Sequence, residues 1–242
     1  MTVKAPLFAL TVCLAILALS CNAPVIKTPT PVTGSTALTS DRGSLVFADD
    51  FTDSAAGWST EKSADFKASF SPSGYVIVSR DLADDEVASP YVIPKDQLSI
   101  SVTATQSSGS PTESGFGAAC DRGLKQQTIS YDFTVQIDGT WGVVRYDQRP
   151  GATNPQARLK QGTSPKAPGA ISITVELMCA TLSDGITTRL VMFVNSTQVA
   201  DITDPVTDPP RLGWLGGLVV RNDGSGPTTV TATHYEERDL TL

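Results

Sequence analysis

The chain has 242 residues, of which 40% are hydrophobic and 18% are charged, and its formal net charge at pH 7 is −7. This length and hydrophobic content are sufficient for one sizeable core. The negative charge, together with the absence of any cluster of lysines and arginines, argues against nucleic acid or an anionic lipid surface as an electrostatic partner.

The N-terminus carries the pattern of an export signal. Lys4 supplies a positive charge, and the apolar run Leu7–Leu19 is too short to span a bilayer comfortably. The run ends in Ala18-Leu19-Ser20-Cys21, which resembles the lipobox of bacterial lipoproteins, with Ala18 in place of the usual leucine. We therefore expect residues 1–20 to be a signal peptide and Cys21 to carry lipid, which would anchor the protein on the extracytoplasmic side of a cell membrane. The alternative is a chance cysteine at the end of the run.

Residues 21–43 are rich in proline, threonine and serine and show no hydrophobic period. This composition is typical of a semi-extended tether. The rest of the chain, residues 44–242, is expected to form one domain.

From Ser44 onward, hydrophobic residues alternate with polar ones, as they do in half-buried strands. The alternation predicts about a dozen strands and no amphipathic helix, and therefore an all-β, two-sheet antiparallel sandwich or a barrel. Its clearest segments are Gln97–Gln106, Thr128–Asp138, Trp141–Tyr146, Ala170–Leu182, Arg189–Val194, Thr197–Ile202, Leu212–Arg221 and Thr228–Leu242. Asp138-Gly139 and Asn195-Ser196 predict tight turns between neighbouring strands.

The cysteines favour one disulfide. Cys13 leaves with the signal peptide and Cys21 takes lipid, which leaves Cys120 and Cys179 as a pair in an oxidising compartment. Each is in phase with the hydrophobic residues of its strand and is therefore expected to point into the core. We predict a buried Cys120–Cys179 bridge; two free buried thiols are the alternative.

Several motifs occur in an order that resembles the laminin G-like domains of bacterial lipoproteins and kinase ectodomains. They are Asp49-Asp50-Phe51-Thr52-Asp53 with Gly57-Trp58, Ser73-Gly74-Tyr75-Val76-Ile77, Gly115-Phe116-Gly117, Tyr131-Asp132-Phe133, Leu190–Val199 and Gly213–Val220. The resemblance covers nearly all of residues 44–242. It implies the concanavalin A-like lectin/glucanase fold, a jelly-roll of two antiparallel sheets, and this fold carries lectins, glycoside hydrolases and protein-binding modules alike.

Acidic and histidine residues give no recognisable catalytic constellation, and no cofactor is expected. The alternating carboxylate pattern of glycoside hydrolases on this fold is absent. Asp84-Asp85-Glu86, expected in a loop, and Glu236-Glu237 are interpreted as solvated charge, with Asp84, Asp85 and Glu86 as weak calcium candidates. His234, the only histidine, alternates with Val230 and Ala232 and is interpreted as a partly buried strand residue.

Aromatic rings are the side chains that sugar-binding surfaces use, because a ring face stacks on the apolar face of a pyranose. Trp141, Tyr146 and Trp214 are the candidates for such a surface, with Arg145 as a polar neighbour. The alternative is that the tryptophans pack in the core, as expected for Trp58.

The sequence thus predicts a lipid-anchored surface protein that is not an enzyme and binds a glycan or an extracellular protein. Two alternatives remain. One is a glycoside hydrolase on the same fold with an unrecognised active site, and the other is a structural domain of an envelope complex.

Overall fold

The computed structural model describes residues 43–82, 84–123, 128–164, 172–205, 213–224 and 226–240. These ranges contain fifteen strands and no helix. The predicted signal peptide, Cys21 and the predicted tether up to residue 42 lie outside the described residues. Among the residues that are described, no helix has the length and hydropathy to cross a membrane.

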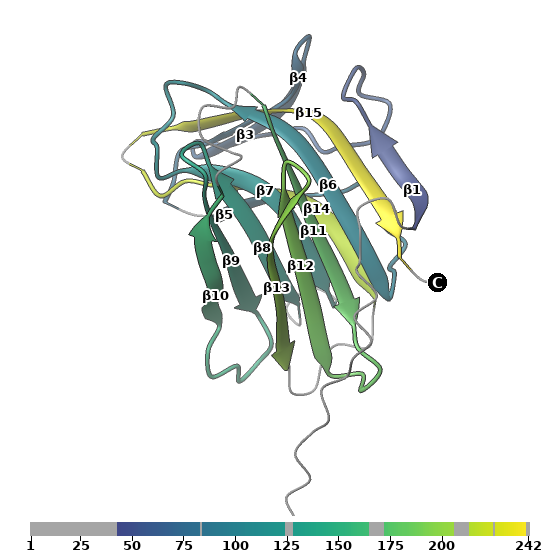
Figure 1. Ribbon diagram of the computed structural model, residues 1–242. Coiled ribbons are helices and arrows are strands. Elements are labelled where there is room, and N and C mark those ends of the chain that lie inside the picture. The colour runs from purple at the N-terminus through teal and green to yellow at the C-terminus, as the bar shows by residue number, and fades with distance from the viewer. Residues whose placement is uncertain are drawn as a thin grey trace, which may run out of the picture. The chain divides into compact units, whose positions relative to one another are not determined.

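Nine strands form the larger sheet, in which every pairing is antiparallel (Figure 1). Eight of them lie in the order β13 (Thr197–Pro205), β12 (Thr187–Val194), β11 (Ile173–Thr181), β6 (Gln97–Gln106), β15 (Thr228–Asp239), β4 (Gly74–Ser79), β3 (Phe66–Ser71) and β2 (Glu61–Lys62). The ninth, β1 (Ser44–Asp49), pairs with the C-terminal part of β15.

The other six strands form the second sheet, which is also antiparallel throughout. Their order is β10 (Gln156–Thr163), β9 (Thr140–Asp147), β8 (Ile129–Gln136), β7 (Gly115–Arg122), β14 (Trp214–Arg221) and β5 (Asp84–Ala88). Because β5, β7 to β10 and β14 alternate along the chain with strands of the larger sheet, the chain crosses between the sheets repeatedly. This confirms the predicted two-sheet antiparallel sandwich; the prediction of about a dozen strands was too low.

Alternate residues of both sheets face each other and form one core. In β8, the four hydrophobic side chains that the alternation assigned to one face are at most 2% exposed; they are Ile129, Tyr131, Phe133 and Val135. Leu98, Ile100 and Val102 of β6 are equally buried. Burial of each large apolar side chain stabilises the fold by about 1.5–3 kcal/mol.

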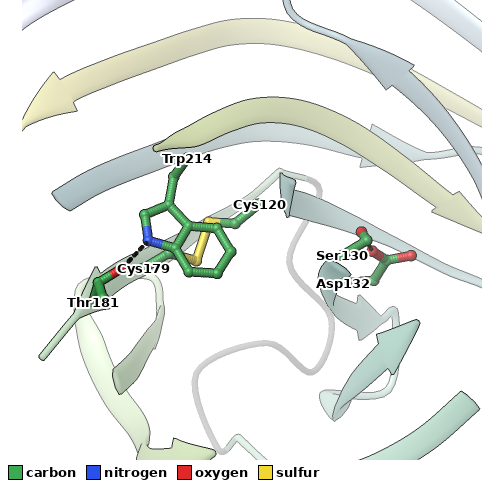
Figure 2. The surroundings of a disulfide bond; sticks show 6 residues. All are labelled: Cys120, Ser130, Asp132, Cys179, Thr181 and Trp214. Carbon is green, nitrogen blue, oxygen red and sulfur yellow. Dashed lines mark hydrogen bonds between the residues drawn. A yellow bond between two sulfur atoms is a disulfide. The ribbon is translucent and has the colours of Figure 1, made fainter. Parts of the chain in front are cut away.

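A disulfide joins the two sheets inside this core. Cys120 of β7 and Cys179 of β11 are bonded across a Cα–Cα distance of 6.5 Å, which confirms the predicted pair. Figure 2 shows the indole of Trp214 beside the disulfide, and its Nε1 donates a hydrogen bond of 3.3 Å to Thr181 Oγ1. The two cysteines are 59 residues apart, and closing a loop of that length stabilises a fold by about 4 kcal/mol in the chain-entropy model.

The two predicted turns have the backbone conformations that tight hairpins need. Gly139 has φ +89°, and the backbone N–H of Thr140 donates to Asp138 Oδ1 at 2.7 Å. Asn195 and Ser196 have φ +46° and +63°, as in a type I′ turn. Both turns therefore fix the register of the strands they connect.

Candidate functional site

The outer face of the six-stranded sheet carries polar side chains beside a few apolar ones, such as Val144 and Val219, whereas its inner face belongs to the core. In β8, Asp132 and Thr134 alternate with the inward-facing Tyr131, Phe133 and Val135, so both point outward. The same alternation in the neighbouring strands assigns the other residues of this outer face.

Small residues occupy the middle of the outer face. In one row of paired residues, Gly217 of β14 lies opposite Ala119 of β7, which lies opposite Asp132 of β8. In the next row, Gly117 of β7 and Gly142 of β9 lie on either side of Thr134 of β8 and both pair with it. Because these residues have small side chains or none, they leave room for the larger polar groups around them.

The sheet is curved so that its outer face is concave. The hydroxyl of Tyr146 in β9 donates a hydrogen bond to Asp84 Oδ2 in β5, although three strands lie between β9 and β5. In a flat sheet, four strand spacings amount to about 19 Å, which is more than these two side chains can bridge. The concave face is called the outer groove below, and its polar residues are Asp84, Glu86, Asp121, Ser130, Asp132, Tyr146 and Arg221.

Asp132 is the most deeply buried carboxyl group of the outer groove. It is 4% exposed, and Oδ1 accepts a hydrogen bond of 2.7 Å from the hydroxyl of Ser130 (Figure 2). Burial, reinforced by the negative charges of Asp84 and Asp121 and opposed by the Ser130 hydrogen bond, raises the pKa of Asp132 to about 8. Asp132 is therefore largely protonated at neutral pH and can donate a proton or a hydrogen bond.

Glu86 and Asp121 form a carboxyl pair. Desolvation of the Glu86 carboxyl group and the nearby Asp121 raise the pKa of Glu86 well above its usual range, although part of the Glu86 side chain is exposed to solvent. Two carboxyl groups share a hydrogen bond only when one of them is protonated. Glu86 lies directly over Gly217, because a Cβ atom there would be 2.6 Å from Glu86 Oε1.

Asp84 lies between a hydroxyl and a guanidinium group. Besides the hydrogen bond from Tyr146, its Oδ1 is 3.7 Å from Arg221 Nε. Burial raises the pKa of Asp84, while Tyr146 and Arg221 partly offset that effect. Burial and the Asp84 carboxyl group likewise raise the pKa of the Tyr146 hydroxyl, which stays protonated as a donor.

A pocket of about 90 Å³ opens next to these residues and shares Arg221 with the outer groove. Its lining is mostly polar and consists of Thr134, Gln136, Thr140, Trp141, Gly142, Arg158, Gln161, Arg221 and Asp223. The two guanidinium groups come from β10 and β14, which three strands separate, so the pocket also depends on the curvature of the sheet.

The four residues proposed from the sequence as a ligand-binding surface do not lie together. Trp141 and Trp214 are 5% and 1% exposed and belong to the core, as the packing alternative had it. Arg145 points between the sheets, where its Nη1 donates to Asp204 Oδ2 at 2.9 Å. Tyr146 alone is part of the outer groove.

The expectation that Asp84, Asp85 and Glu86 lie in a loop was wrong, and only Glu86 of the three is exposed as solvated charge would be. They belong to β5, whose alternation sends Asp84 and Glu86 outward and Asp85 to the other face. Within the described ranges, no three acidic, histidine or cysteine side chains are grouped to hold a metal ion.

Glu237 was also misread as solvated. It is 1% exposed between the sheets, and its Oε1 accepts a hydrogen bond of 2.7 Å from Tyr235. His234 is a partly buried residue of β15, as interpreted from the sequence: its side chain is 37% exposed, and its Nδ1 is 2.5 Å from Asp50 Oδ1. A register shift between Ala232 and His234 turns its side chain away from the core face that Val230 and Ala232 share.

Sequence reasoning missed Asp121, Asp132, Arg158 and Arg221 as site residues. For Asp132 a signal was present. Its two neighbours in the sequence, Tyr131 and Phe133, are hydrophobic and predicted to face the core, so the alternation of a strand requires Asp132 to face outward. The side chains that meet Asp132 come from strands far apart in the sequence, and no local pattern reports those pairings.

No protein-family model and no curated protein matches this sequence. Among solved structures, the chain is similar to the carbohydrate recognition domain of Emp46p. The potassium-bound form has a TM-score of 0.54 and 9% identity over 80% of this chain and 94% of that one. The metal-free form has a TM-score of 0.52 and 11% identity over 80% of this chain and 93% of that one.

The alginate lyase Aly36B has a TM-score of 0.48 and 10% identity over 77% of this chain and 88% of that one, a likeness too weak to support an argument. At these identities the likeness to Emp46p shows the fold alone. It confirms the concanavalin A-like sandwich predicted from the sequence.

Proposed function

We propose that this chain is an exported, lipid-anchored surface protein that binds a glycan in the outer groove without catalysing a reaction. The observation that carries this proposal is the convergence of carboxyl, hydroxyl and guanidinium groups from five strands on one concave face. Concave sites with a few fixed polar groups are the usual binding sites for small molecules.

The chemistry of these groups suits sugar hydroxyls. The protonated Asp132 donates, and the ionised carboxylates and the Ser130 hydroxyl accept, so a sugar ring would find partners for both roles of its hydroxyl groups. The solved domain with a similar fold is described as a carbohydrate recognition domain, which supports the same class of ligand here.

One observation favours a second candidate function, hydrolysis of the bound glycan. Glycoside hydrolases pair a protonated carboxyl group, which acts as the general acid, with a second carboxylate. Asp132, with its raised pKa, lies in the same groove as Asp84 and Asp121. This composition fits the general-acid part of such a mechanism.

A glycan array probed with the full-length chain, purified in detergent, tests glycan binding. Asp132→Ala removes a carboxyl group of the outer groove and is expected to weaken binding to any hit at least tenfold. The matched control is Asp201→Ala in β13, whose side chain pairs with Arg189 at 2.7 Å on the other sheet. A folded wild-type chain that binds no glycan, or hits that both variants retain equally, would contradict the proposal.

Asp132→Asn separates binding from hydrolysis, because the amide preserves the shape of the protonated carboxyl group but cannot supply its proton. If the protein only binds, mass spectrometry of each hit after incubation finds it intact. Cleavage by the wild type that Asp132→Asn abolishes while binding persists would replace binding by hydrolysis as the function.

The lipid anchor is tested at Cys21. Cys21→Ser removes the thiol that would carry the lipid, so the protein is expected to move from the membrane fraction to the soluble fraction when it is expressed in a bacterial host. Equal membrane partitioning of the variant and the wild type would refute the anchor.

A further inference from the structure

We propose that the pocket beside the outer groove binds an anionic substituent, a carboxylate or a sulfate, of the glycan. This inference rests on the proposed function, because the glycan backbone would lie in the outer groove and carry the charged group into the pocket. It begins from Arg158, whose guanidinium group forms no ion pair in the described part of the structure, although Asp84 lies within range of its charge.

Arg158 forms no ion pair with any residue that the structure describes. Its Nη1 donates to Gln161 Oε1 at 2.8 Å, and both side chains are exposed on β10 while lining the pocket. The hydrogen bond holds the guanidinium group at the pocket without neutralising its charge.

Arg221 provides a second guanidinium group on the opposite side. Its charge is shared with Asp223, whose Oδ2 lies 2.5 Å from Nε, and with Asp84. The pocket therefore combines one guanidinium group that forms no ion pair with one that is fixed in place by carboxylates, and one of these carboxylates, Asp223, also lines the pocket. Guanidinium groups bind carboxylate and sulfate oxygens through strong charge-assisted hydrogen bonds.

The pocket also has room for such a group. A Cβ atom on Gly142 would meet only Lys160 O, at 3.9 Å, so the space above this residue is open. A water molecule needs about 10–15 Å³ of comparable volume, and about 90 Å³ therefore accommodates a carboxylate or a sulfate.

The carboxyl groups of the outer groove would repel an anion if all were ionised. Asp84, Glu86 and Asp132 all have raised pKa values, because burial disfavours their charged forms. Asp132 in particular, whose pKa is raised to about 8, is largely uncharged at neutral pH, which reduces the repulsion of an anionic glycan.

Isothermal titration calorimetry with the full-length chain tests the inference. The probes are three oligosaccharide series of equal length: neutral, uronate-containing and sulfated. We expect at least one acidic series to bind about tenfold more tightly than the neutral series, with an affinity that falls as sodium chloride rises. Preference for uronate identifies a carboxylate, preference for sulfate identifies a sulfate, and preference for both identifies a general anion pocket.

Two variants test whether the preference for acidic glycans arises in the pocket. Arg158→Gln removes the charge, and Gly142→Val fills the open space at a strand position that tolerates a β-branched residue. Both are expected to bring acidic glycans down to the affinity of neutral ones. Arg189→Gln, which removes an arginine from the other sheet, is the matched control and should keep the preference.

Equal affinity of the wild type for neutral and acidic glycans would overturn this inference and leave the proposed function standing. A preference that survives both Arg158→Gln and Gly142→Val would also overturn it. A folded chain that binds none of the three series contradicts the proposed function itself.

Discussion

The six-stranded sheet carries one polar cluster on each face, and the two clusters differ in how their charges are balanced. On the inner face, Asp204 accepts hydrogen bonds from the Tyr131 hydroxyl at 2.9 Å and from Arg145 at 2.9 and 3.1 Å, so an acid meets a base and a hydroxyl. On the outer face, carboxyl groups outnumber their cationic partners; burial raises the pKa of Asp132 to about 8, so that it retains its proton at neutral pH, and raises that of Glu86 well above its usual range.

Neighbouring residues of β9 show the difference directly. Arg145 points inward and completes a network between the two sheets, whereas Tyr146 points outward and meets Asp84 across the outer groove. In the inner cluster the charges are balanced, because the guanidinium group of Arg145 meets the carboxylate of Asp204, although Arg145 Nε makes no hydrogen bond. In the outer cluster, burial keeps the Asp132 carboxyl group protonated at neutral pH. Strongly shifted pKa values of this kind are expected where a protein binds a ligand.

Gly216 and Gly217, which are consecutive in β14, each lie against a polar side chain, one on the inner and one on the outer face of the sheet. A Cβ atom on Gly216 would be 2.5 Å from the Tyr235 hydroxyl inside the sandwich, and one on Gly217 would be 2.6 Å from Glu86 outside it. Consecutive glycines thus let polar side chains approach β14 closely from both faces.

The largest expected effect on the free energy of unfolding comes from removing the charge of Asp204 in the inner cluster. Asp204→Asn preserves the shape of the side chain but leaves the Arg145 guanidinium group without its counter-charge between the sheets. Breaking such a pair costs about 3 kcal/mol, which urea denaturation at pH 7 would measure.

The control for Asp204→Asn is Asp201→Asn, which breaks the more exposed pair with Arg189 and should change the stability by less than about 1 kcal/mol. If the two variants lose equal stability, the inner cluster contributes no more than a surface pair, and the contrast between the two faces disappears.

The fold could be predicted because its signals are local. The alternation in β8 and β6 assigned the core residues correctly, and the phase of Cys120 and Cys179 placed both sulfur atoms inside. Turn residues such as Asp138-Gly139 marked the hairpins for the same reason.

The candidate site could not be predicted, because it depends on pairings between distant strands and on curvature. Asp84 and Tyr146 are 62 residues apart and meet only because the sheet curls. For Trp141 the phase was available, since Val143 is buried on the same side of β9, and it favours the alternative of core packing that the sequence left open. For His234, a one-residue register shift in β15 was invisible in the sequence.

The outer cluster should give an effect with the opposite sign. The pKa of Asp132 is about 8 in the folded protein and about 3.9 in an unfolded chain. Between these values the folded state holds a proton that the unfolded state has lost, so this residue makes stability fall as the pH rises from about 4 to about 8. Asp84 and Glu86, whose pKa values are also raised, act in the same direction.

Asp132→Asn removes the titrating group while preserving its shape, so the variant and the wild type should be equally stable near pH 4. At about pH 9 the variant should be more stable by at least about 1 kcal/mol, since it has no charge to bury beside Asp84, Asp121 and Tyr146. Urea denaturation at both pH values measures this difference, and Asp201→Asn should show no such gain. A difference that does not grow with pH would mean that Asp132 is already ionised at neutral pH, and the outer cluster would then resemble the balanced inner one.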